Sequence, residues 1–203
     1  MIADTLDRVK IIPVLVLNSL EEGIAVCEKL CANGLPAAEI TFRTSAAEAV
    51  IREAAKRFPE MLIGAGTVLN AADLHRAAAA GAKFAVAPGF NPAVAAEALK
   101  IGFDFIPGVC TPSEMEQAMA LGFRTLKFFP AEAAGGVAML KSLIAPYRHL
   151  GVRFMPTGGV KPANVESYLA IPEVAAVGGT WLNNCDAETI RAAAEIAARY
   201  SAK

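Results

Sequence analysis

The sequence has few charged residues, almost no net charge and no long apolar run, and each shortage excludes a class of protein. Only 19% of the 203 residues are charged and the formal net charge is -1, which leaves no positive surplus for binding nucleic acid or an anionic membrane. The longest apolar stretch, residues 11–17, is interrupted by Pro13 and is much shorter than the roughly 18 residues of a membrane span. Because 55% of the residues are hydrophobic, we expect a folded globular protein. The low charge and the short apolar run predict that it binds neither nucleic acid nor a membrane.

Metal ligands and targeting signals are scarce as well. Cys27 and Cys31 are four residues apart in a predicted helix, but no second cysteine pair and no nearby histidine completes a metal site. The simpler interpretation is that the cysteines are small buried side chains in a reducing compartment. Asp4 and Asp7 stand where a signal peptide would carry Lys or Arg, so we expect a cytoplasmic protein. Because the ligand set is incomplete, we also expect no bound metal.

Short apolar segments typical of buried strands recur along the chain at intervals of 20 to 28 residues. Such an interval accommodates one strand, a loop and one helix of ten to thirteen residues, roughly. The segments begin at Ile11, Ala38, Leu62, Phe84, Asp104, Thr125, Arg153 and Val174. The pattern predicts a strand–helix unit that repeats over the whole chain.

The stretches between these segments are rich in alanine, the residue with the highest helix propensity. Capping residues mark where the helices begin: Ser19, Asn70, Asn91-Pro92 and Thr111-Pro112. Asn33-Gly34 and Gly81 mark two helix ends. Each predicted strand is therefore followed by a helix.

Eight apolar strands, each followed by a helix, require a parallel sheet that is covered on its outer face. We expect an α/β fold, a minimal (β/α)8 TIM barrel that forms a single domain over residues 1–203 with a short N-terminal helix. The alternative is an open doubly wound sheet, which usually has fewer strands. Its nucleotide-binding fingerprint is incomplete here, because Leu69 follows Gly64 and Gly66 where the third glycine would stand.

Lys127 is a lysine inside an otherwise apolar strand. Strand alternation places Thr125, Lys127 and Phe129 on one face and Leu126 with Phe128 on the other. Either face of a barrel strand is shielded from water, which disfavours the ammonium form and favours the free amine that Schiff-base chemistry needs. A structural lysine paired with a carboxylate in the barrel is the alternative interpretation.

Glu39 supplies a carboxylate that is predicted to point into the barrel. Glu39, Thr41 and Arg43 alternate with Ile40 and Phe42, so the three polar side chains share one face. A glutamate inside the barrel can transfer protons, and Arg43 at the mouth can hold a substrate carboxylate through two parallel hydrogen bonds. An ion pair of Glu39 with the buried lysine or with Arg43, which merely fills the core, remains the alternative.

Two glycine pairs close the last two predicted strands, in Thr157-Gly158-Gly159 and Gly178-Gly179-Thr180. Barrel enzymes often bind phosphate with the loops after these two strands and with the N-terminus of a short extra helix. Glycines let backbone N–H groups approach phosphate oxygens, and we expect residues 181–184 to form the short helix. Tight turns are the other role that such glycines serve.

Five motifs, in order along essentially the whole chain, carry a resemblance to a known enzyme family. They are Glu39-Ile40-Thr41-Phe42-Arg43-Thr44, Gly64-Ala65-Gly66-Thr67-Val68, Lys127-Phe128-Phe129-Pro130-Ala131-Glu132, Pro156-Thr157-Gly158-Gly159-Val160 and Gly178-Gly179-Thr180-Trp181-Leu182. They resemble the motifs of 2-keto-3-deoxy-6-phosphogluconate (KDPG) aldolase, a class I aldolase of the Entner–Doudoroff pathway that often also cleaves 4-hydroxy-2-oxoglutarate (KHG).

The resemblance implies that Lys127 is the Schiff-base lysine and Glu39 the general acid/base. The substrate-binding residues that it implies are Arg43 and Thr67 for the carboxylate of the pyruvate half, Pro88 and Phe129 for its methyl group, Thr157 for the sugar-acid chain, and Gly158, Gly159, Gly178, Gly179 and Thr180 for the phosphate. The family usually has Ser where this chain has Thr180, which keeps the hydroxyl but stiffens the side chain.

The resemblance further implies a small phosphorylated keto-acid substrate, no cofactor, no metal and a homotrimer. An aldolase that prefers the phosphogalactonate epimer stays open as an alternative. More remote alternatives are a phosphosugar isomerase or epimerase and a non-catalytic phosphometabolite-binding protein on the same barrel.

Overall fold

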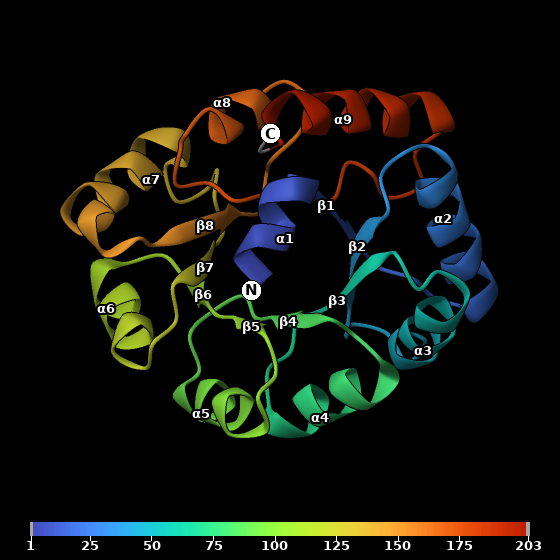
Figure 1. Ribbon diagram of the computed structural model, residues 1–203, viewed down its shortest axis with the longest axis horizontal. Helices are drawn as coiled ribbons and strands as arrows, with labels where there is room; N and C mark the ends of the chain where they lie inside the picture. Colours follow the sequence, from blue (N-terminus) through green and yellow to red (C-terminus); the bar gives the residue numbers. More distant parts are fainter. Residues whose placement is uncertain (1, 202–203) are drawn as a thin grey trace.

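Strands and helices alternate along the computed structural model, which describes residues 2–201 (Figure 1). The strands are β1 (Ile11–Leu15), β2 (Ala37–Thr41), β3 (Leu62–Gly66), β4 (Phe84–Val86), β5 (Phe105–Ile106), β6 (Gly108–Val109), β7 (Thr125–Phe128), β8 (Arg153–Pro156) and β9 (Val177–Gly179). The helices are α1 (Ile2–Val9), α2 (Leu20–Ala32), α3 (Ala47–Arg57), α4 (Ala71–Ala80), α5 (Pro92–Ile101), α6 (Pro112–Ala120), α7 (Gly136–Ile144), α8 (Val165–Leu169) and α9 (Ala187–Tyr200), with a 3-10 helix, η1, over Ala145–Leu150.

The strands close into a parallel barrel. One sheet has the order β5-β4-β3-β2-β1-β9 and the other β6-β7-β8, and single bridges from Phe154 to Val174 and from Thr157 to Gly178 join β8 to β9. Pro107 separates β5 from β6, because proline has no N–H to donate to the ladder, yet its carbonyl still accepts from the Lys127 N–H at 2.9 Å. Since β5 and β6 occupy the place of one strand, the predicted (β/α)8 barrel is confirmed.

The last strand departs from its predicted start. The first seven strand segments begin within one residue of the predicted positions, whereas β9 begins at Val177 and not at Val174. Its neighbour β1 begins only at Ile11, which lies opposite Val177 in the register. Residues before Val177 therefore have no β1 partner, and Val174 forms only the isolated bridge to Phe154.

The predicted helix caps are present. The side chains of Ser19, Asn70, Asn91 and Thr111 each accept a hydrogen bond from a backbone N–H in the first turn of the helix that follows. Gly81 ends α4 in the left-handed region with a φ of 93°. These local signals set the lengths of the helices that surround the barrel.

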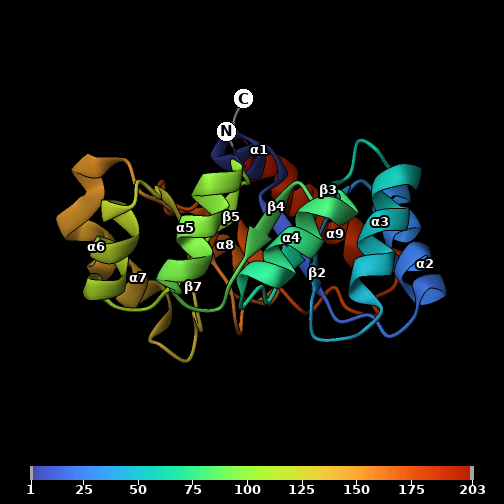
Figure 2. The same cartoon turned by 90° about the horizontal axis from the view of Figure 1, so that it is seen from below.

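Two apolar cores lie on the two faces of the barrel wall. The larger core fills the space between the strands and the surrounding helices. The smaller core lies inside the barrel and is made of Leu6, Ile12, Ala37, Leu62, Phe84, Val86, Ile106, Met155, Ala175 and Ala176. Its Leu6 belongs to α1, which lies across the end of the barrel where the strands begin (Figures 1 and 2). Helix α1 thus closes one end, and the loops after the strands form the other.

Candidate active site

The buried lysine and glutamate meet inside the barrel. Lys127 Nζ lies 3.1 Å from Glu39 Oε1 and 3.3 Å from Oε2, although the two residues are 88 positions apart in the sequence. Lys127 is 4% exposed and Glu39 1% exposed. An amine and a carboxylate in hydrogen-bond contact and shielded from water can exchange a proton directly.

Strand alternation explains why these two side chains point inward. Leu126 and Phe128, the neighbours of Lys127 in β7, pack in the core between the strands and the helices. Ile40, the neighbour of Glu39 in β2, packs in the same outer core. Since successive side chains of a strand point to opposite faces, Lys127 and Glu39 both face the interior. This direction was predicted for Glu39, whereas the sequence left both faces of the strand open for Lys127.

Gly66 makes room for the Glu39 side chain, a role that the sequence analysis missed. A Cβ on Gly66 would lie 2.2 Å from Glu39 Oε1, 2.7 Å from its Cγ and 2.8 Å from its Cδ. Gly66 ends β3, the strand that pairs with β2. A glycine within a strand often marks such a close approach, so this signal was present in the sequence.

Arg43 and Thr67 lie together just beyond the ends of β2 and β3. Arg43 Nε donates a hydrogen bond to Thr67 Oγ1 at 3.0 Å, and Arg43 is exposed. Thr67 has a φ of 58°, in the left-handed region that β-branched residues rarely adopt. Backbone strain of this kind is concentrated at functional sites, where the surrounding structure maintains it. The alternative Glu39–Arg43 ion pair is thus replaced by contacts of Glu39 with Lys127 and of Arg43 with Thr67.

Phe129 directly follows the lysine strand β7, and Pro88 lies against the neighbouring strand β6. The Phe129 ring centroid is 5.6 Å from Lys127 Nζ. Gly108 is the register partner of Lys127, and a Cβ on it would lie 2.3 Å from the carbonyl carbon and oxygen of Pro88. The structure therefore places Phe129 against the amine and Pro88 against the strand next to it.

The two glycine pairs also come together. Thr157, which is 4% exposed, forms a parallel bridge with Gly178, and a Cβ on Gly178 would lie 2.3 Å from Thr157 Oγ1. Gly158 and Gly159 adopt φ values of 101° and 80°, which only glycine reaches without strain. The ends of β8 and β9 are therefore neighbours, as the phosphate-site hypothesis requires.

The short helix predicted after β9 is absent, so this expectation was wrong. Residues 181–184 form turns, with a hydrogen bond from the Asn183 N–H to the Thr180 carbonyl at 3.0 Å. Asn184 has a φ of 57°, which breaks a right-handed helix, and Asp186 then caps the start of α9. Thr180 itself is exposed at the mouth, in front of this turn.

Comparison with known proteins decides the family. The family model described as KDPG and KHG aldolase matches residues 2–198. The chain belongs to this family. The KHG/KDPG aldolase of Escherichia coli K12 is 42% identical over 177 residues, which cover 87% of this chain and 82% of that protein.

Solved structures of the family have the same fold. The KDPG aldolase of Legionella pneumophila, described with pyruvate captured as a covalent carbinolamine intermediate, has a TM-score of 0.87 and 36% identity, with 98% of each chain covered. The Zymomonas mobilis ZM4 KDPG aldolase with 3-phosphoglycerate has a TM-score of 0.89 and 36% identity, and covers 98% of this chain and 95% of that one.

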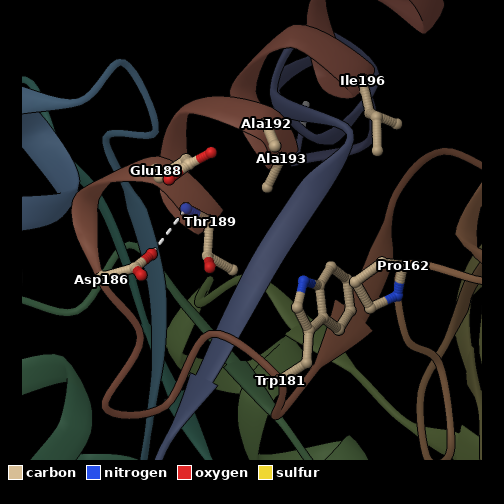
Figure 3. A pocket seen from close by; sticks show the side chains of 8 residues that line it. All are labelled: Pro162, Trp181, Asp186, Glu188, Thr189, Ala192, Ala193 and Ile196. Carbon is tan, nitrogen blue, oxygen red and sulfur yellow. Dashed lines mark hydrogen bonds between the residues drawn. The ribbon is translucent and has the colours of Figure 1, made fainter.

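A separate hollow of about 350 Å³ lies between Trp181 and α9 (Figure 3). Its lining residues are Pro162, Trp181, Asp186, Glu188, Thr189, Ala192, Ala193 and Ile196. The Trp181 ring forms one wall and lies so close to Gly179 that a Cβ there would be 1.6 Å from Cζ3. None of the predicted site residues lines this hollow, so Trp181 supports the β9 end from outside the barrel.

The described residues contain no cluster of metal ligands, and their cysteines are unpaired. Among residues 2–201, no group of three or more His, Cys, Asp or Glu side chains lies close enough to share a metal ion. All four cysteines are free thiols, and burial raises the pKa of the Cys27 thiol to about 12. No helix in the same range is long and apolar enough to cross a membrane.

Proposed function

We propose that this protein is a class I aldolase in which Lys127 forms a Schiff base with KDPG and Glu39 moves the protons, and that it also cleaves KHG. The contact between Lys127 Nζ and Glu39 inside the barrel carries this proposal. A buried ion pair contributes little to stability, because desolvation of the two ions offsets most of their attraction. A catalytic role, in which the pair reacts with a substrate that enters through the mouth of the barrel, explains better why the two charged groups are buried together.

The first half of the reaction forms the imine. Glu39 takes a proton from Lys127 Nζ, and the neutral amine attacks the C2 carbonyl carbon of the substrate. Glu39 then returns a proton to the carbinolamine hydroxyl, which leaves as water. The resulting protonated imine withdraws electrons from C3, so no metal is needed to polarise the carbonyl.

The second half breaks the C3–C4 bond. Glu39, again a carboxylate, accepts the proton of the C4 hydroxyl while the bond electrons pass into the imine. The aldehyde product, glyceraldehyde 3-phosphate from KDPG, leaves, and an enamine of pyruvate remains on Lys127. Protonation of the enamine at C3 and attack of water at C2 release pyruvate and restore the amine.

The remaining residues hold the two ends of the substrate. Arg43 and Thr67 bind the carboxylate, since a guanidinium forms paired hydrogen bonds with a planar carboxylate. Phe129 and Pro88 pack against the methyl group of the pyruvate half. The Thr157 hydroxyl faces the sugar-acid chain. The phosphate binds to backbone N–H groups of Gly158, Gly159, Gly178 and Gly179 and to the Thr180 hydroxyl.

A coupled assay of pyruvate release tests the proposed activity. KDPG, its phosphogalactonate epimer and KHG are compared side by side at equal concentrations. We expect the highest kcat/KM with KDPG and measurable cleavage of KHG. A higher kcat/KM with the phosphogalactonate epimer would favour that alternative substrate. No pyruvate from any of them, together with isomerisation of a phosphosugar, would favour the isomerase alternative.

We also propose a homotrimer that works in the cytoplasm as part of the Entner–Doudoroff pathway. These assignments rest on membership of the family. Size-exclusion chromatography with light scattering tests the assembly: a mass three times that of the 21.2 kDa chain is expected, and a monomeric mass would contradict it.

A further inference from the structure

Tyr168 and Glu132 form a pair that the proposed reaction does not use. Tyr168, in α8, is 0% exposed, and its hydroxyl donates a hydrogen bond to Glu132 Oε1 from a position 36 residues further along the chain. A buried hydroxyl without an acceptor is unfavourable, and Glu132 provides the acceptor for the buried Tyr168 hydroxyl. The pair joins the segment after β7 to the helix after β8.

Glu132 also lies directly against the loop that carries Gly158 and Gly159. Its backbone N–H donates to the Gly158 carbonyl at 3.0 Å, and the neighbouring Ala131 N–H donates to the Thr157 carbonyl at 2.8 Å. A Cβ on Gly159 would lie 2.6 Å from the Cβ of Glu132 and 2.7 Å from its Cγ. The backbone and the methylene groups of Glu132 thus fix one side of the loop.

The other side of this loop is held by α8 and the residues before it. Asn164 Nδ2 donates to the Gly159 carbonyl at 3.2 Å, and Asn164 Oδ1 accepts from the Lys161 N–H at 2.8 Å. Asn164 directly precedes α8, which carries Tyr168. Consequently, the Tyr168–Glu132 hydrogen bond links the two sets of contacts that hold Gly158 and Gly159.

We propose that Glu132 and Tyr168 are a positioning pair that sets the Gly158–Gly159 loop for the substrate phosphate and thereby the preference for phosphorylated over unphosphorylated substrates. This inference rests on the proposed function, which places the phosphate at the glycine loops. The hydrogen bond also holds Oε1 of the Glu132 carboxylate, a negative charge that would repel a phosphate if it turned toward the loop. Imine formation at Lys127 does not depend on this pair.

Tyr168→Phe tests the inference, because it removes only the hydroxyl. We expect KM for KDPG to rise about tenfold, which corresponds to about 1.4 kcal/mol, with kcat within about twofold of wild type. Both constants for KHG, which has no phosphate, should stay within about twofold. Tyr147→Phe is the matched control, since it breaks a hydrogen bond to Glu116 of 2.7 Å on the exposed surface and should change neither substrate's KM.

Two variants of the acceptor separate positioning from general damage. Glu132→Gln keeps an oxygen that can accept from Tyr168, so KM for KDPG should stay near wild type. Glu132→Ala removes the acceptor and the Cγ contact with the loop, so it should raise KM for KDPG at least as much as Tyr168→Phe. Glu132→Ala also replaces Tyr168→Phe as the test if the latter does not fold. Equal losses on KDPG and KHG, or an unchanged KM for KDPG, would overturn the pair's role.

A different experiment, covalent trapping with pyruvate, tests the proposed function separately from the role of the pair. Wild-type protein that is not trapped by pyruvate and borohydride would overturn the aldolase proposal and the pair's role with it. Trapping of the wild type and of Tyr168→Phe, together with an unaltered ratio of KM values in the variant, would overturn the pair's role alone.

Discussion

Replacing Gly66 with Ala should displace the Glu39 carboxylate from Lys127 without mutating either of these two residues. The new Cβ would lie 2.2 Å from Glu39 Oε1, whereas ordinary contacts begin near 3.4 Å. The carboxylate must therefore move by about 1 Å, and a displacement of that size can cost about 100-fold in rate. Because Gly66 has no positive φ, the alanine fits the backbone, and the effect comes from the side-chain contact.

The assay combines kcat/KM for KDPG with thermal unfolding. We expect kcat/KM to fall about 100-fold. The added methyl group should also destabilise the fold by about 1–3 kcal/mol, as extra volume in a packed interior usually does. Gly89→Ala is the control: it makes the same change at the mouth of the barrel, where a Cβ would meet nothing within 4 Å, and should leave both quantities near wild type.

The reasoning would be refuted by a Gly66→Ala protein that cleaves KDPG at the wild-type rate. That result would mean that the Glu39 carboxylate moves aside at no cost, or that its position beside Lys127 does not matter for the reaction. A loss of activity that is matched by the Gly89→Ala control would point to general damage at the barrel mouth.

Four further changes test other parts of the account. Glu39→Gln should still be trapped by pyruvate and borohydride while kcat falls about 100-fold or more; an unchanged kcat would leave Glu39 a structural residue. Thr180→Val should lower kcat/KM for KDPG about 10- to 150-fold and leave KHG within a few-fold, and equal losses would contradict a phosphate contact. EDTA should not affect activity, and an inhibited enzyme would reopen the question of a metal. Because Cys27 is fully buried and burial raises the pKa of its thiol to about 12, iodoacetamide should label it only after unfolding, as peptide mass spectrometry can show.

Much of the barrel could be predicted because its signals are local. Apolar segments at even spacing gave the strand positions, and capping residues such as Ser19 and Thr111 gave the helix starts. The inward direction of Glu39 followed from the two-residue period of a strand, which for Lys127 gave only the residues that share its face. The turn at residues 181–184 was not predicted, because the left-handed φ of Asn184 depends on its tertiary context.

Contacts between segments that are distant along the chain could not be predicted from the sequence. The residues around Tyr168 in the sequence do not indicate that its hydroxyl reaches Glu132. An aromatic residue in a short helix is usually interpreted as a residue of the apolar core. Gly66 likewise has a role only because β2 places Glu39 beside it. The pairing of Lys127 with Glu39 was one of several alternatives until the closed barrel brought β2 and β7 face to face.

Covalent trapping with pyruvate tests the central claim most directly. The protein is incubated with pyruvate and borohydride, which reduces an imine to a stable amine, and its peptides are mapped by mass spectrometry. We predict the mass of one reduced pyruvyl group on Lys127, and no adduct in Lys127→Arg, because a guanidinium stays protonated and does not attack the carbonyl. An adduct on Lys83, Lys100 or Lys141, or no adduct on the wild-type protein, would contradict the account.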